Sequence, residues 1–140
     1  KNDSFILRFS ELLNFTPFLF PLACHDAKFA PIYVEELSEF IIQAIKDTKS
    51  FNKQYNLCGP KIYTLKEILE LIIKIKDRNI RVIPLSKKMS KMQAFIMEFI
   101  PGKPFSLDNY NSCQIDSYCK SDFNFYSDLE TIVPSYINSE

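Results

Sequence analysis

The scarcity of glycine limits what this chain can fold into and what it can bind. Only 2 of its 140 residues are glycine, Gly59 and Gly102, and neither has a glycine neighbour. A loop that lets the backbone approach a pyrophosphate needs two or three glycines within about six residues. The chain therefore carries no dinucleotide-binding loop of the usual kind, and we expect it to bind no cofactor by itself.

Length and composition are those of one globular domain, residues 1–140. The chain is 46% hydrophobic and 24% charged, which excludes wholesale disorder and leaves enough apolar surface for a core. Lys+Arg and Asp+Glu both number 17. A chain without net charge has no field to hold a polyanion, so we expect no nucleic-acid partner.

The start of the chain does not look like a secretory signal, because it has no basic stretch before an apolar run. The longest apolar stretch, 15–24, is short and interrupted by Pro17 and Pro21, so it cannot span a bilayer. We therefore expect a cytoplasmic protein. The missing initiating Met suggests a fragment, or a trimmed or processed chain.

Cysteine spacing gives no metal pattern. The thiols and the single imidazole are Cys24, His25, Cys58, Cys113 and Cys119, without a CxxC pair. Cys113 and Cys119, with Asp116 between them and Asp122 beyond, match no common structural zinc spacing. We expect reduced thiols, Cys58 as a small buried hydrophobe, and a solvent-near turn rather than a nucleophile at Cys24-His25.

Hydrophobic periodicity and capping residues predict helices separated by a few short strands. Helices are expected to begin near Asp3 or Ser4, Val34, Thr64, Ser86, Ser106 and Ser127, with TLKE at 64–67 and SDLE at 127–130 as capping boxes. Short strands or extended runs are expected at 29–34, 55–58 and 80–83. The predicted fold class is helix-rich α/β, with too few strands to complete a sheet alone.

One predicted helix has two interpretations. An apolar stripe at helical spacing lies beside lysines in the set Lys87, Lys88, Met89, Lys91, Met92, Phe95, Phe99 and Ile100. An amphipathic helix of this kind can lie on a membrane. Such a stripe more often packs in a core, so we expect the core, with weak membrane association as the alternative.

Six short motifs follow one another along most of the chain. They are FAPIYVEEL at 29–37, YNLCGP at 55–60, YTLKE at 63–67, VIPL at 82–85, PGKP at 101–104 and VPSY at 133–136. In this order they resemble the C-terminal half of extended or atypical short-chain dehydrogenase/reductases (SDR) of the NAD-dependent epimerase/dehydratase type. Within that family they are most similar to the branch that includes the SDR-like accessory subunit of respiratory complex I.

The resemblance implies a Rossmann fold completed by an N-terminal half that binds NAD(P), with this chain shaping the substrate pocket. Two features depart from the family. Residues 23–26 are Ala-Cys-His-Asp where the family usually has glycines, and no tyrosine has lysine four residues later. Proton transfer by a lysine-assisted tyrosinate cannot occur within this chain, so we expect it to be catalytically silent alone.

The resemblance places the substrate side, and the interface with the Rossmann half, near two strand-to-helix junctions. The candidates there are Tyr33, Glu35, Glu36, Gly59 and Pro60. For the two acids we favour a simpler interpretation, since acidic residues in the first turn of a helix favour its dipole. Gly59-Pro60 is interpreted as a turn. We expect no catalytic, cofactor-binding or metal-binding residue in this chain.

Two functions follow from these observations. The leading one is the substrate-side region of an NAD(P)-dependent epimerase/dehydratase-like oxidoreductase. The alternative is a non-catalytic interaction or scaffold module of a membrane or respiratory-complex assembly, peripheral to the inner membrane. Without the N-terminal half, the apolar junctions at 29–34 and 55–60 would face water, so we expect the isolated chain to self-associate as a dimer.

Overall fold

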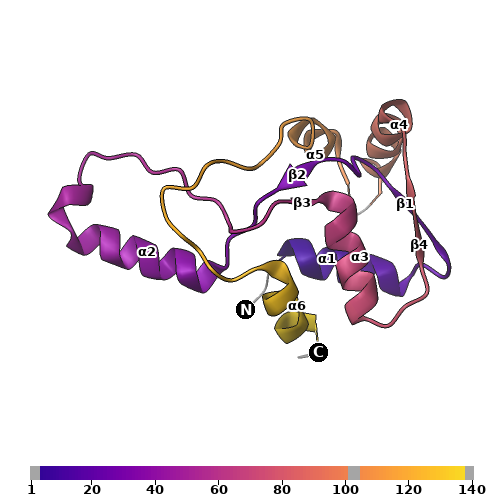
Figure 1. Cartoon of the computed structure of the whole chain (residues 1–140). Helices are drawn as coiled ribbons and strands as arrows, with labels where there is room; N and C mark the ends of the chain where they lie inside the picture. The colour runs from indigo at the N-terminus through magenta and orange to yellow at the C-terminus, as the bar shows by residue number, and fades with distance from the viewer. Residues whose placement is uncertain (1–3, 101–104, 138–140) are drawn as a thin grey trace.

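A computed structural model describes residues 4–100 and 105–137 and confirms the helix-rich α/β class (Figure 1). Within those residues the elements are α1 (Ser4–Asn14), β1 (Leu19–Leu22), β2 (Lys28–Phe29), α2 (Val34–Lys46), the 3-10 helix η1 (Thr48–Ser50), β3 (Tyr63–Thr64), α3 (Leu65–Ile75), β4 (Arg81–Pro84), α4 (Lys87–Met97), α5 (Leu107–Ser112) and α6 (Leu129–Ile137).

The strands form two small pairs rather than one sheet. β1 lies parallel to β4, with Leu22 opposite Pro84. β2 lies antiparallel to β3, with Phe29 opposite Tyr63. A parallel pair needs a long crossover, which here contains α2 and α3. Pro21 lies within β1, a position that an edge strand tolerates.

The prediction of a strand at 55–58 is wrong, because these residues form no strand. The strand or extended run expected at 29–34 is a strand only as far as Phe29. Backbone N–H groups of 55–58 donate hydrogen bonds to side chains of a loop distant in sequence, rather than to a neighbouring strand. Asn56 N–H donates to the Asp122 carboxylate at 2.8 Å, and Cys58 N–H donates to Ser121 Oγ at 3.3 Å. The strand expected at 80–83 is confirmed as β4, displaced by one residue.

Local capping signals set the beginnings of three helices as expected. Thr64 Oγ1 accepts the Glu67 N–H, and the Glu67 carboxylate accepts the Thr64 N–H at 2.7 Å, which completes the capping box of α3. Ser86 and Ser106 cap α4 and α5 through their hydroxyl oxygens. The cap expected for α1 at Asp3 or Ser4 lies outside the described side chains.

The capping box expected at Ser127 and Glu130 is wrong. The Asp128 carboxylate accepts the Thr131 N–H at 3.0 Å, so α6 begins one residue later than expected. Glu130 instead pairs with Lys61. Two oxygen-bearing side chains stand next to each other here, and the sequence pattern does not decide which of them caps the helix.

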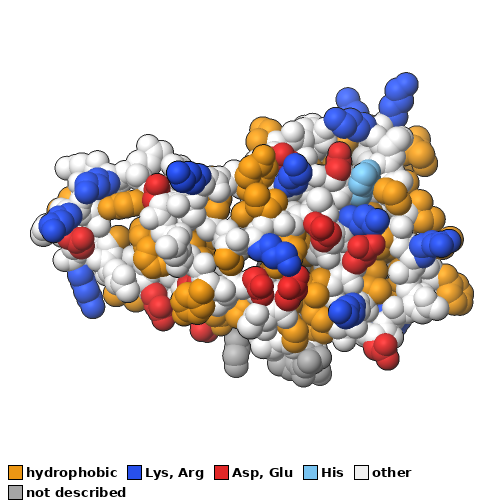
Figure 2. Space-filling view, viewed as in Figure 1, with side chains coloured by type: hydrophobic (Ala, Val, Ile, Leu, Met, Phe, Trp, Pro, Cys, Tyr) orange, Lys and Arg blue, Asp and Glu red, His pale blue; other side chains and the backbone are white. Residues whose placement is uncertain are grey.

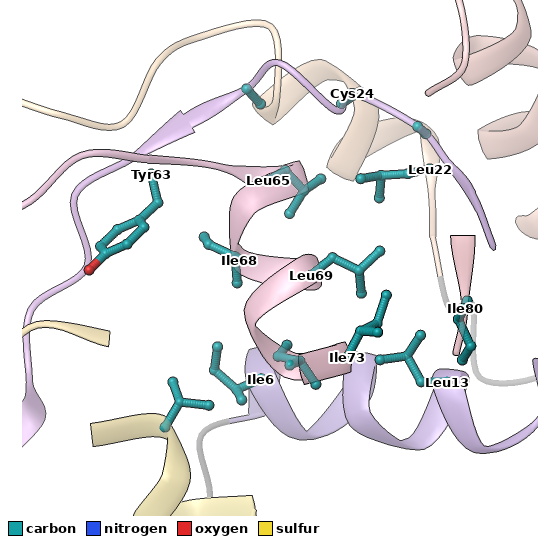
Figure 3. Packing of buried hydrophobic residues seen from close by; sticks show 14 of the residues in the cluster. Ile6, Leu13, Leu22, Cys24, Tyr63, Leu65, Ile68, Leu69, Ile73 and Ile80 are labelled. Atoms are coloured by element: carbon teal, nitrogen blue, oxygen red, sulfur yellow. The ribbon is translucent and has the colours of Figure 1, made fainter. Parts of the chain in front are cut away.

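The core is built around α3. Leu69 and Ile72 are fully buried on this helix. Figure 3 shows side chains of α3 pointing toward Ile6 and Leu13 on α1. α6 closes the same cluster with Val133, which is 1% exposed. The amphipathic stripe that predicted α3 is therefore confirmed as a core stripe.

α2, η1 and the loops 51–60 and 117–127 form an arm that projects from the rest of the chain (Figure 1). Aromatic rings hold the arm together: Phe40 of α2 lies 5.5 Å from Tyr55 and 5.1 Å from Phe123 between ring centroids. Phe123 in turn lies 5.0 Å from the buried Phe125. Ile42 and other apolar side chains of α2 stay exposed.

α4 contradicts the expectation that its apolar stripe packs in the core. The side chains that α4 buries are small ones, Ser90 and Ala94. Met92, Phe95 and Ile96 are each more than half exposed, and Phe99 just beyond the helix is 76% exposed. In the part of the chain that the structure describes, no helix has the length and apolar character needed to cross a membrane.

Candidate functional site

Three chain segments cross at the base of the arm, and the candidate residues lie around this crossing. The segments are 28–31, 56–60 and 116–122. Ala30 N–H donates to the Ser117 carbonyl at 2.9 Å, and Ser117 N–H donates to the Lys28 carbonyl at 2.8 Å. Gly59 N–H donates to the Ala30 carbonyl at 3.0 Å. The two junctions that the family resemblance singled out therefore lie side by side.

Gly59 is needed at this crossing because another backbone segment touches it. A β-carbon at this position would lie 1.8 Å from the Pro31 carbonyl oxygen and 2.7 Å from the Pro31 carbonyl carbon. Backbone atoms cannot move aside as a flexible side chain can, so only glycine fits. The turn interpretation of Gly59-Pro60 missed this close approach, since the approaching segment is distant in sequence.

The remaining candidates differ in their exposure. Tyr33 is half-buried just before α2, whereas Glu35 and Pro60 are exposed. Neither of the two cavities described below is lined by these residues, by Glu36 or by Gly59. Their role at an interface with a Rossmann half stays a prediction.

Glu36 has a more specific role than the helix-dipole interpretation gave it. Its side chain is 5% exposed, and its carboxylate accepts the backbone N–H of Tyr126 at 3.1 Å and of Ser127 at 2.9 Å. It thereby ties α2 to the segment that leads into α6. Exposed Glu35 fits the dipole interpretation, while Glu36 is a structural anchor between segments 90 residues apart.

The expectation of four reduced thiols is wrong for two of them. Cys58 and Cys119 form a disulfide across 61 residues of sequence. The bond is possible because segments 56–60 and 116–122 already run side by side, with Asp122 N–H also donating to the Asn56 carbonyl at 2.8 Å. Cys58 is buried, as expected, but as half of a cross-link rather than as a free hydrophobe.

A polar cavity of about 450 Å³ lies on the body of the molecule and reaches Asp116 at the base of the arm. Its lining comes from the turn after β1, the beginning of α4, and α5 with the loop that follows: residues 24–27, 85–87, Ser90, Tyr110, Cys113, Gln114 and Asp116. His25, Asp26 and Lys87 are among its ionisable groups. The sequence analysis considered Cys24, His25 and Asp116 as candidate functional residues. No local sequence pattern predicts that they lie next to α4 and α5.

Cys24 is not equipped to act as a nucleophile in this cavity. Burial, with a further contribution from neighbouring Cys113, raises the pKa of the Cys24 thiol to about 12. The thiol therefore stays protonated at neutral pH, whereas a nucleophilic cysteine needs a lowered pKa. Residues 23–26 do form a turn, as expected, but Cys24 is buried in it and its backbone N–H donates to Ser90 Oγ.

The residues considered for a metal serve other purposes. Cys119 is in the disulfide, Asp122 accepts the Asn56 N–H, and Asp116 accepts the Lys28 N–H at 3.3 Å. Among the described residues, no group of three or more His, Cys, Asp or Glu side chains is arranged to hold a metal ion.

Among the described residues we find no glycine-rich turn of the kind that a dinucleotide-binding loop uses. Gly59 is the one glycine among them, and its backbone is committed to Ala30 and Pro31. Gly102 lies outside the described residues. No turn in the described ranges offers the paired glycines that a pyrophosphate contact requires. That the isolated chain binds no NAD(P) stays a prediction.

A second, smaller cavity of about 180 Å³ is mostly apolar and lies between α1, β1 and α4. Phe9, Phe20 and Met97 are among its lining residues, and Arg8 is the ionisable basic group beside it. The two cavities share Cys113, the residue that follows α5, as a lining residue. Neither cavity could be found from periodicity, because each joins segments distant in sequence.

The α/β fold, the order of the motifs and the comparison with known proteins support a distant relationship to SDR-like proteins. No family model matches the chain. The chain is 28% identical over 115 residues to NADH dehydrogenase (ubiquinone) 1 alpha subcomplex subunit 9, mitochondrial, of Arabidopsis thaliana. This match covers 75% of the chain and 29% of the relative. The chain thus spans less than a third of the length of that protein.

Proposed function

We propose that this chain is the substrate-side, C-terminal region of an SDR-like protein that serves as a non-catalytic subunit of an NADH dehydrogenase assembly. The observation that carries the proposal is the match, over 75% of the chain, to a protein named as a subunit of such an enzyme. That relative is mitochondrial by name. We therefore favour the mitochondrion over the cytoplasm for this protein.

The geometry of the candidate residues supports a structural role rather than chemistry. The Glu36 carboxylate is occupied by two backbone N–H groups, Gly59 is pressed against Pro31, and Cys58 is cross-linked. A catalytic acid, base or nucleophile needs a side chain that can reach a substrate. Glu36 and the disulfide instead hold segments of the arm to one another, and Gly59 packs the arm against Ala30 and Pro31.

The β1–β4 pair supports a fold completed by further strands. Two parallel strands are a poor sheet by themselves, and parallel sheets are normally covered on both faces. Leu19 of β1 is 54% exposed and Ile83 of β4 is 39% exposed. An N-terminal Rossmann half that extended this pair and covered these side chains would complete the sheet, and without that half the chain would be expected to dimerise.

The polar cavity favours a second candidate function, an active NAD(P)-dependent epimerase/dehydratase in which the cavity holds part of the substrate. Its volume of about 450 Å³ suits a small polar molecule, and His25, Asp26 and Lys87 supply charged and hydrogen-bonding groups. In this case the cofactor and the catalytic tyrosine would come from the N-terminal half.

Isolating the native protein from the cells that make it distinguishes between these two proposed functions. The tagged full-length protein is expressed from its own gene, mitochondria are solubilised with a mild detergent, and the assemblies are separated on a native gel stained for NADH oxidation. We expect the tag in the large NADH-oxidising band. A tag found only at low mass, or a purified protein that turns over NAD(P)H with a sugar nucleotide, would overturn the proposal in favour of the enzyme.

A further inference from the structure

We propose that the outer face of α4 is a docking surface for an anionic membrane, on which the helix lies flat. The outer face is the set Lys88, Lys91, Met92, Phe95, Ile96 and Phe99. This inference goes beyond the proposed function and does not depend on it, because it concerns the surface of this chain alone.

The burial pattern of α4 is the reverse of an ordinary amphipathic helix. Ser90 and Ala94 are one helical turn apart on the side that faces the body, and they are 2% and 0% exposed. Met92, Phe95 and Ile96 point to the opposite side and are 55–56% exposed. A surface helix normally buries its large apolar side chains. Here the large apolar side chains face outward, which marks an interaction surface.

The apolar side chains form one continuous patch. Residues 92, 95, 96 and 99 follow the spacing of a single helical stripe, and the rings of Phe95 and Phe99 lie 5.4 Å apart. Phe99 is the most exposed of them. Aromatic and aliphatic side chains in such a stripe are those that an interfacial helix buries among lipid headgroups and acyl chains.

The charges of α4 select an anionic partner. Lys87, Lys88 and Lys91 are exposed, and α4 itself carries no acidic residue. Lys88 and Lys91 continue the apolar stripe toward the start of the helix, so one face carries both kinds of side chain. Lysines in a first turn oppose the helix dipole. Helix stability therefore does not explain them, whereas attraction to anionic headgroups does.

The position of α4 allows contact with a flat surface. In Figure 1, α4 lies at the upper edge of the molecule, on the opposite side from the arm. Figure 2 shows hydrophobic and basic side chains gathered over the same edge. A bilayer could meet this edge without touching the arm or α6.

α2 provides a matched contrast within the same molecule. It also exposes apolar side chains, and Lys46, Lys49 and Lys53 lie exposed at and beyond its end. Each helix is followed by one acidic residue, Asp47 after α2 and Glu98 after α4, but α2 also carries Glu35 and Glu36 in its first turn, whereas α4 has no acid within the helix. Mixed charge makes α2 a weaker site for anionic lipid than α4.

Vesicle flotation of the purified full-length protein tests the proposal. The probes are phosphatidylcholine vesicles with and without phosphatidylglycerol, at low and at high salt. We expect binding to the anionic vesicles that weakens at high salt, because surface charges are screened. Replacing Lys87, Lys88 and Lys91 with glutamine should weaken binding about a hundredfold, at roughly fivefold for each lysine. Phe95→Ser with Phe99→Ser should weaken it about tenfold or more.

The matched control replaces Lys46, Lys49 and Lys53 with glutamine, which removes the same charge from the arm and should leave binding nearly unchanged. These substitutions are all at exposed positions, so each variant should fold. Equal loss in the control, or no flotation with either lipid, would overturn the proposal. So would concentration-dependent dimerisation that Phe95→Ser and Phe99→Ser abolish without any vesicle binding, since α4 would then be a contact between copies.

Discussion

Replacing Glu36 with glutamine tests how α2 is held to the segment that leads into α6. The carboxylate oxygens accept the Tyr126 N–H at 3.1 Å and the Ser127 N–H at 2.9 Å, and the side chain is 5% exposed. Glutamine keeps one acceptor oxygen and places an NH2 group, a donor, opposite the second N–H. One charge-assisted hydrogen bond is lost, and two donors then face each other in a buried place.

The expected cost can be worked from these contacts. A hydrogen bond to a charged group contributes about 1.5–3 kcal/mol to stability, and a buried donor left without an acceptor costs a similar amount. We therefore expect Glu36→Gln to lower the free energy of unfolding by about 2–3 kcal/mol. With a urea slope of about 1–3 kcal/mol per molar, the unfolding midpoint should fall by about 0.7–3 M.

Glu35→Gln is the matched control, since it makes the same chemical change one residue earlier on an exposed side chain. It should change the free energy of unfolding by less than about 0.5 kcal/mol. Urea unfolding followed by far-ultraviolet circular dichroism measures both variants. If Glu36→Gln is no more destabilising than Glu35→Gln, the carboxylate does not anchor α2 to the segment before α6, and our account of this site is wrong.

Urea unfolding also tests four further substitutions. Ile72→Ala should lower the free energy of unfolding by about 2–5 kcal/mol, because Ile72 is fully buried in α3. Thr64→Ala should lower it by only about 0.5–2 kcal/mol, because only the helix cap is lost. A larger loss for Thr64→Ala than for Ile72→Ala would refute the burial assignment. Gly59→Ala should cost about 1–3 kcal/mol or more because its β-carbon would overlap Pro31, and a neutral result would exclude the close crossing. Cys58→Ser should cost about 4 kcal/mol relative to the oxidised protein, since the disulfide closes a loop of 61 residues, and reductant should destabilise only the parent.

Sequence alone predicts elements that local signals define. α3 has a capping box at Thr64 and an apolar stripe at helical spacing, and the structure has both. A cap and a periodicity act within a few residues, so they can be recognised before the fold is known. The strand β4 follows from local alternation in the same way.

Contacts between distant segments are not encoded in such patterns. Glu36 finds its partners 90 and 91 residues away, and Cys58 finds Cys119 across 61 residues. The disulfide lies at the crossing of distant segments at the base of the arm, and the same crossing replaces the strand expected at 55–58. Neither cavity could be anticipated for the same reason.

Periodicity also does not say which side of a helix faces the core. The spacing of Phe95 and Phe99 predicts an apolar face on α4, but the helix is packed through Ser90 and Ala94. Small side chains let a helix approach its neighbour closely, and the large ones then point outward. The sequence identified the amphipathic helix correctly and its buried side wrongly.

The sequence of the transcript upstream of the Lys1 codon tests the central claim most directly. If this chain is the substrate-side region of an SDR-like protein, the reading frame should continue upstream and encode a Rossmann half. That half should contain a glycine-rich turn of the Gly-x-x-Gly-x-x-Gly type between its first strand and helix. A reading frame that instead begins near Lys1, with no strand-to-helix glycine motif before it, would contradict the account.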